Sequence, residues 1–143
     1  MGQNGAVATN HPQATAVGVD VLRSGGNAFD AAVAISLTLG VVEPAMSGLG
    51  GDGFYHVWLA KSGKTLVYNG TGPAPKAACK ERFNQTGIPV FGPLSASTPG
   101  LVGGLSALHS NHGQQSWSQM CNTAADVADN GFFVTHALSL IHI

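Results

Sequence analysis

The sequence has few charged residues. Only 9% of its 143 residues are Asp, Glu, Lys or Arg, against about 25% in an average soluble domain. A disordered chain needs high charge and low hydrophobicity, whereas 44% of these residues are hydrophobic, so disorder is excluded. The charged residues are also too few to give a complete monomer of this size its polar surface. We therefore expect the chain to be part of a larger body.

Basic clusters, long apolar runs and a secretory signal are also missing. Six Lys and Arg stand against seven Asp and Glu with no basic block, which excludes nucleic acid as a partner. The longest apolar run, residues 28–42, contains Asp30 and is shorter than the roughly 20 residues of a membrane span, so no membrane insertion is expected. The N-terminus lacks the basic start and apolar core of a signal peptide, which predicts a cytoplasmic protein or one given without its leader.

Metal-binding patterns are absent as well. Cys79 and Cys121 have no paired spacing and are expected to be small packing residues. Of the six histidines, only His109 and His112 are three residues apart on an expected helix, where they suit the free carbonyl groups of its last turn. We therefore expect neither a metal site nor a cofactor.

Helical patterns begin near the N-terminus. The first helix is predicted to start at Pro12 and to end at the glycine pair 25–26. Asn27 is expected to cap a second helix, with Asp30 in the first turn, where the helix dipole favours a carboxylate. This helix is apolar on every side up to Val42, so it is predicted to be the most buried element.

Two more helices are predicted near the C-terminus. Thr98 is expected to cap a helix that begins at Pro99 and ends near residue 113. Ser116 and Gln119 make a capping-box pattern for the last helix. The predicted buried faces are Leu101, Leu105 and Leu108 in the first of these helices, and Trp117, Met120, Cys121, Ala124, Val127 and Ala128 in the second.

Between the helix pairs lies a predicted β-hairpin. Residues 54–60 and 65–69 are rich in aromatic and β-branched side chains, and a short turn containing a glycine joins them. His56 alternates with its aromatic neighbours on one face, so it is expected to be packed. Residues 70–97 carry four prolines and are expected to be irregular, apart from a short helix near residues 76–84. The fold class is therefore α+β.

A glycine-rich loop, residues 47–53, joins the second helix to the hairpin. Its four glycines permit positive φ angles and close backbone approach, so a ligand or another segment can lie directly on the main chain. Phosphate-binding glycine loops run from a strand into a helix, whereas this loop runs the other way and contains Asp52. We interpret it as tight packing or a substrate loop rather than a phosphate site.

The residues alone identify no catalytic nucleophile. The sequence has no Gly-x-Ser-x-Gly nucleophile elbow. Thr135 and His136 have the side chains of a nucleophile and a base, but adjacent residues seldom point the same way, so we do not interpret them as a catalytic pair.

Several motifs follow one another in a distinctive order. They are Val7-Ala8-Thr9-Asn10-His11-Pro12, Gly25-Gly26-Asn27-Ala28, Asp30-Ala31-Ala32-Val33-Ala34, Ser47-Gly48-Leu49-Gly50-Gly51, Thr98-Pro99-Gly100 and Ala107-Leu108-His109. Together they resemble the gamma-glutamyltransferase family from Val7 to about Val134. The resemblance implies that residues 1–136 are an N-terminal fragment of a gamma-glutamyltransferase-like domain, and it leaves residues 137–143 as an unaligned apolar tail.

The resemblance implies an N-terminal-nucleophile hydrolase with an αββα sandwich, of which a helix pair, a hairpin and a helix pair are present here. It implies a precursor that cleaves itself into a large and a small subunit, with this chain at the front of the large one. The catalytic threonine and the oxyanion hole then belong to the small subunit, so this chain alone is expected to be inactive. The implied substrates are gamma-glutamyl compounds such as glutathione, or related small amides, processed through an acyl-threonine intermediate.

One departure from the family bears on the substrate. The family has an arginine shortly before an Ala-Pro pair, and this arginine binds the substrate carboxylate. Here Thr71 stands at or near that position, and we take Asn69 and Thr71 as the candidate substrate-binding residues. Threonine carries no charge, which favours the oxamate amidohydrolase or cephalosporin acylase-like branches. The remaining alternative is a non-catalytic module that kept the fold, and a downstream threonine at a cleavage junction would distinguish the two.

Overall fold

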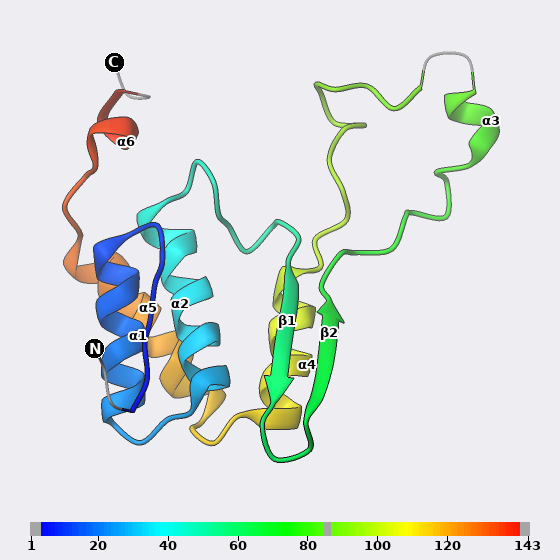
Figure 1. Ribbon diagram of the computed structural model, residues 1–143. Helices are drawn as coiled ribbons and strands as arrows, with labels where there is room; N and C mark the ends of the chain where they lie inside the picture. Colours follow the sequence, from blue (N-terminus) through cyan, green and yellow to red (C-terminus); the bar gives the residue numbers. More distant parts are fainter. Residues whose placement is uncertain (1–3, 85–86, 141–143) are drawn as a thin grey trace. The chain divides into compact units, whose positions relative to one another are not determined.

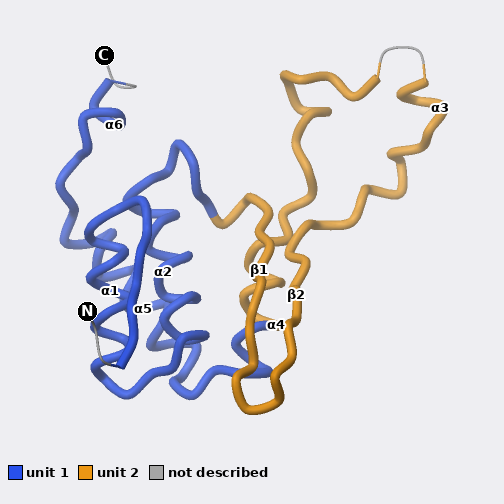
Figure 2. The backbone as a smooth tube through the Cα atoms, in the orientation of Figure 1, with its two compact units in different colours: residues 1–48, 108–143 blue, residues 49–107 orange. Residues whose placement is uncertain are grey.

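The computed structural model describes residues 4–84 and 87–140 (Figure 1). The chain forms two compact units (Figure 2), of which unit 1 comprises residues 1–48 and 108–143 and unit 2 comprises residues 49–107. The elements are α1 (Pro12–Arg23), α2 (Ala28–Val42), β1 (Phe54–Leu59), β2 (Lys64–Asn69), α3 (Lys80–Phe83), α4 (Leu101–His112), α5 (Trp117–Asn130) and α6 (His136–Leu140). Within the described ranges, no helix is long and apolar enough to cross a membrane.

Unit 1 is built around α2. This helix packs against both α1 and α5, and Figure 1 shows the three side by side. It contributes more buried residues than either neighbour, as its all-round apolar sequence predicts. The crossing with α1 is close, because a Cβ on Gly18 would lie 2.5 Å from Cδ1 of Ile35. A larger residue at Gly18 would require the Ile35 side chain to move.

Local signals set the ends of α1 and α2. Gly25 adopts a φ of +91°, a left-handed conformation that favours glycine and ends α1 where predicted. Asn27 and Asp30 form a reciprocal capping box at the start of α2. The Asn27 side chain accepts hydrogen bonds from the N–H groups of Phe29 and Asp30 at 2.8 and 3.0 Å. The predicted second helix and its cap are confirmed.

Unit 2 contains the predicted hairpin. Strands β1 and β2 pair antiparallel, from Phe54 opposite Asn69 to Leu59 opposite Lys64. The face that carries Tyr55 packs on the first turn of α4, since the Tyr55 hydroxyl donates to the carbonyl oxygen of Leu101 at 3.0 Å. The opposite face, which carries His56, is exposed, so the prediction that His56 is packed is wrong. Alternation along a strand shows which residues share a face, but it does not show which face is covered.

The later helices follow the predicted order with small changes. Helix α4 begins at Leu101, two residues after Pro99, and it buries Leu105 and Leu108. Helix α5 is capped by Ser116, which accepts a hydrogen bond from the N–H of Gln119. The buried residues of α5 are Met120, Ala124 and Val127. Of the other residues predicted to be buried, Leu101, Trp117 and Cys121 are partly buried and Ala128 is exposed.

Candidate functional site

The two candidate substrate-binding residues form one turn in unit 2. Asn69 is the last residue of β2, and its side-chain oxygen accepts a hydrogen bond from the N–H of Thr71 at 2.9 Å. This closes an Asx turn, a local loop that holds the backbone of Thr71 against the end of the strand. Both side chains are exposed. The structure therefore brings Asn69 and Thr71 together on the surface of unit 2.

Backbone crossings surround this turn. The N–H and carbonyl of Gly70 pair with those of Gly53, at 2.7 Å and 3.4 Å between nitrogen and oxygen. The N–H groups of Gly100 and Leu101 both donate to the carbonyl oxygen of Gly51, at 3.2 and 3.0 Å. Three segments of unit 2, which precede β1, follow β2 and lead into α4, thus meet main chain to main chain.

Glycine is required at these crossings because no side chain fits. A Cβ at Gly72 would overlap the carbonyl oxygen of Thr98, and a Cβ at Gly100 would overlap that of Gly70. At Gly104, in the first turn of α4, a Cβ would lie 2.7 Å from the Tyr55 ring and 2.8 Å from the Cα of Gly70. The close backbone approach predicted for the glycine-rich loop is present, and it extends to glycines far along the chain.

Asp52 holds two segments of this region together, whereas in the sequence it served only as an argument against phosphate. Its Oδ2 accepts a hydrogen bond from the Ser97 hydroxyl at 2.6 Å, and its Oδ1 accepts one from the N–H of Gly72 at 3.4 Å. The carboxylate therefore bridges the two ends of the loop formed by residues 73–96. No pattern in the sequence pairs Asp52 with Ser97, because the two lie 45 residues apart.

Tyr55 packs against the backbone crossing of these segments. Burial raises the pKa of its phenol above the ordinary value, because the charged phenolate is poorly solvated there. The phenol therefore stays protonated at neutral pH and donates to Leu101 at the start of α4. The Tyr55 side chain also occupies the positions that a Cβ on Gly53, Gly70 or Gly104 would need, so it packs directly against the backbone of these glycines.

A buried carboxylate organises the interior of unit 1. Asp30 has no exposed surface, and it accepts hydrogen bonds from the N–H groups of Asn27, Gln114 and Gln115 at 2.9, 3.0 and 3.3 Å. His109 places Nε2 3.6 Å from the carboxylate and 2.9 Å from the carbonyl oxygen of Gln115. The sequence predicted Asp30 in the first turn of α2, where the helix dipole favours it, but it predicted neither the hydrogen bond from Asn27 nor those from the segment between α4 and α5.

His11 is a second buried polar side chain of unit 1 that sequence reasoning did not single out. It is the N-cap of α1, where its Nδ1 accepts a hydrogen bond from the N–H of Gln13 at 3.2 Å. Its ring is 5% exposed and meets the Phe132 ring edge to face, at 6.2 Å between centroids. Because Nδ1 accepts, the proton of the neutral ring lies on Nε2, which has no hydrogen-bond partner among the described residues.

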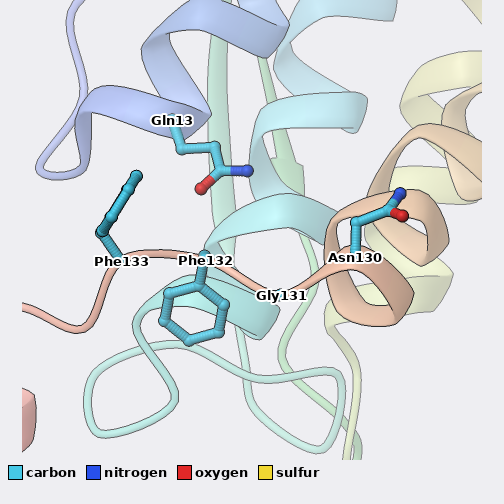
Figure 3. A pocket seen from close by; sticks show the side chains of 5 residues that line it. All are labelled: Gln13, Asn130, Gly131, Phe132 and Phe133. Carbon is cyan, nitrogen blue, oxygen red and sulfur yellow. The ribbon is translucent and has the colours of Figure 1, made fainter.

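An open pocket of about 540 Å³ lies on unit 1 at the end of α5. Its lining residues are Gln13, Asn130, Gly131, Phe132 and Phe133. Figure 3 shows the side chains of Phe132 and Phe133 pointing to opposite sides of this segment, with the Gln13 amide beside it. The pocket holds no charged side chain, and neither Asn69 nor Thr71 belongs to it.

Among the described residues, no three His, Cys, Asp or Glu side chains gather where they could hold a metal ion. Cys79 and Cys121 are both free, the first exposed and the second partly buried. The Thr135 hydroxyl accepts a hydrogen bond from the N–H of Leu138 at 3.2 Å, at the start of α6. That contact is typical of a helix cap.

Comparisons with known proteins give one consistent result. The model of the family described as Gamma-glutamyltranspeptidase matches residues 14–141. The glutathione hydrolase proenzyme of Bacillus subtilis is 38% identical over 146 residues, which is 97% of this chain and 25% of that protein. The chain thus spans about a quarter of the length of this relative.

Solved structures agree over almost the whole chain. A gamma-glutamyltranspeptidase from Pseudomonas nitroreducens, complexed with L-DON, matches with a TM-score of 0.87 and 34% identity, over 99% of this chain and 44% of that one. A cephalosporin acylase from Bacillus halodurans matches with a TM-score of 0.81 and 29% identity, over 98% of this chain and 29% of that one. The two units therefore have the partial αββα fold of N-terminal-nucleophile hydrolases that the motifs predicted.

Proposed function

Because this chain belongs to the gamma-glutamyltranspeptidase family, we propose that it is the N-terminal part of the large subunit of an enzyme that cleaves gamma-glutamyl compounds or related small amides. The observation that carries the proposal is the structural match over 99% of the chain to a gamma-glutamyltranspeptidase. The enzyme either hydrolyses the substrate or transfers its acyl group, through an acyl-threonine intermediate.

The nucleophile of this reaction is a threonine of the small subunit cleaved from the same precursor. The comparison with a relative supports this assignment. The Bacillus subtilis relative is named a proenzyme, and this chain spans only a quarter of it.

The small subunit and the rest of the large one are expected to cover the exposed face of the hairpin. Phe54, Trp58 and Val67 lie on this face and are 68%, 60% and 61% exposed. His56 stands between the two aromatic residues and pairs with Val67 across the strands. A contiguous apolar sheet face is typical of one layer of a sandwich, which is stable only when a second layer packs on it.

Asn69 and Thr71 are proposed to contact the substrate. Their turn is exposed, and its backbone is held by the Asx hydrogen bond. Thr71 offers a hydroxyl that donates and accepts, but it cannot neutralise a carboxylate as a guanidinium does. We therefore expect gamma-glutamyl compounds to be weak substrates and uncharged amides to be better ones.

The second candidate function is an amidohydrolase of the cephalosporin acylase or oxamate amidohydrolase kind. Thr71 in place of arginine favours it, and so does the match to a cephalosporin acylase at 29% identity. The third candidate is a non-catalytic module with the same fold, which amidase activity of the processed protein would exclude.

The test is the substrate preference of the processed enzyme that contains this chain. Replacing Thr71 with Arg is expected to raise kcat/KM for gamma-glutamyl substrates by about one to two decades, since a hydrogen bond to a charged group contributes about 1.5 to 3 kcal/mol. The kcat/KM for uncharged amides should change little. Thr65→Arg is the matched control, because it adds the same charge at another exposed threonine of unit 2.

Two outcomes would contradict this proposal. If the processed enzyme turns over neither class of amide, the catalytic function is wrong and the module is non-catalytic. If Thr71→Arg has no effect on gamma-glutamyl substrates while Arg82→Ala abolishes their turnover, the carboxylate is bound by the exposed Arg82 of α3 instead.

A further inference from the structure

Asp52 bridges two segments that lie far from it in the sequence. The Ser97 hydroxyl donates to Oδ2 at 2.6 Å across 45 residues, and the N–H of Gly72 donates to Oδ1 at 3.4 Å across 20 residues. Gly72 and Ser97 flank the loop of residues 73–96, whose described residues, 73–84 and 87–96, are mostly exposed and irregular. We call this arrangement the Asp52 clamp, formed by Asp52, Gly72 and Ser97. It closes the base of the loop.

The clamp binds Gly72, where close neighbours restrict the backbone. Gly72 has no room for a Cβ because the carbonyl oxygen of Thr98 lies against it. The next contact along the chain is between Gly100 and the carbonyl of Gly51, at 3.2 Å. Asp52 therefore binds a segment that main chain already confines.

Thr71 lies between two hydrogen bonds of this region. Its own N–H donates to the Asn69 side chain at 2.9 Å, and the N–H of the next residue, Gly72, points to Asp52. A β-branched side chain has few rotamers, so a fixed backbone leaves the Thr71 hydroxyl few positions. The carboxylate of Asp52 thus limits where this hydroxyl can be, without touching it.

We propose that Asp52, acting through Ser97 and Gly72, is the positioning residue that fixes the Asn69–Thr71 turn for substrate binding. This proposal rests on the proposed function, in which that turn contacts the substrate. The short bond from Ser97 is charge-assisted, and bonds of this kind are stronger and more directional than neutral ones. Loss of the clamp leaves the reacting groups intact, so it should weaken binding and spare the chemical step.

The experiment uses the processed full-length enzyme and its preferred small amide from the Thr71 comparison. Ser97→Ala removes one arm of the clamp and leaves the charge of Asp52 in place. We expect KM to rise about threefold to tenfold with kcat within about twofold, and amide hydrogen exchange of the peptide around Gly72 to speed up about tenfold. Ser97→Thr, which keeps a hydroxyl, should restore both values.

Ser95→Ala is the matched control. Ser95 is an exposed serine of the same loop whose hydroxyl also donates a 2.6 Å hydrogen bond, but to the carbonyl oxygen of Gly92 only three residues away. This variant should leave KM and the exchange around Gly72 unchanged. Equal effects of Ser95→Ala and Ser97→Ala would overturn the proposal, because any loosening of the loop would then be enough.

The two readouts separate the possible failures. If Ser97→Ala speeds exchange around Gly72 but leaves KM unchanged, the clamp is structural and its positioning role is wrong. If neither value changes, the clamp itself is wrong. If the unaltered enzyme has no amidase activity, the proposed function fails and the positioning role fails with it, while hydrogen exchange still decides whether Asp52 closes the loop.

Discussion

Replacing Asp30 with Ala should destabilise unit 1 severely. The carboxylate has no exposed surface and accepts hydrogen bonds from the N–H groups of Asn27, Gln114 and Gln115. A buried donor left without an acceptor costs about 1 to 3 kcal/mol. Because these three donors are only partly buried, we take the lower part of that range for each and expect a loss of about 3 to 5 kcal/mol in the free energy of unfolding. Domains are stable by only about 5 to 15 kcal/mol, so the loss is a large fraction of the total.

The assay is urea unfolding followed by the fluorescence of Trp117. The Trp117 and His109 rings meet edge to face, with 5.4 Å between their centroids, and His109 lies beside the Asp30 carboxylate. The fluorescence of Trp117 therefore reports on the surroundings of Asp30. Trp58→Phe in the background removes the other tryptophan. With an m-value of about 2 kcal/mol per molar urea, the midpoint should fall by about 2 M.

Asp30→Asn and Asp126→Ala complete the series. The amide keeps one acceptor oxygen but turns an NH₂ group toward N–H donors, so its cost should lie between those of Ala and the parent residue. Asp126 is exposed on α5, and its removal should change stability by less than about 0.5 kcal/mol. The reasoning is refuted if Asp30→Ala lowers the midpoint no more than Asp126→Ala does.

Three further predictions concern pH, activity and association. Burial raises the pKa of Tyr55, so the folded state binds the phenol proton more tightly than the unfolded one; this stabilisation is complete below about pH 10 and is lost as the pH rises through the folded pKa. Tyr55→Phe removes the hydrogen bond to the carbonyl oxygen of Leu101, which should cost about 0.5 to 1.5 kcal/mol in the free energy of unfolding at neutral pH. Because Phe has no phenol proton, stability should also decline less steeply at alkaline pH, and urea unfolding at several pH values measures both effects. The chain alone should not release product from gamma-glutamyl-p-nitroanilide, and turnover by pure protein that Thr135→Ala abolishes would show that the nucleophile is misplaced here. The chain alone should also self-associate through the exposed hairpin face, and Trp58→Lys should reduce the apparent mass in sedimentation velocity, whereas a monodisperse parent would contradict this expectation.

Most of the fold could be predicted because its signals are local. Asn27 with Asp30, the glycine at position 25 and the hairpin turn each act within a few residues, and each was found where expected. The exposed His56 could not be predicted in the same way. Its exposure depends on what packs against the hairpin, and that information lies in residues far along the chain, such as Leu101 and Gly104.

The candidate site was predicted in part. Asn69 and Thr71 were selected by resemblance, and the structure joins them in one turn. The partnership of Asp52 with Ser97 leaves no pattern in the sequence, because a hydrogen bond between residues 45 apart depends on the path of the chain. The glycines that allow the crossing were visible, but their sequence does not show that Gly72 must face Thr98.

Because the base of the loop of residues 73–96 is closed, the length of this loop should have little effect on the stability of the rest of unit 2. The ends are fixed by the Asp52 clamp and by the backbone contacts of Gly53 and Gly51. For a flexible loop closed in this way, each doubling of length costs only about 0.6 kcal/mol in closure entropy. Insertions and deletions between residues 73 and 96 should therefore be tolerated by the fold, so this segment can diverge quickly or accept a grafted peptide while the turn at its base keeps its shape.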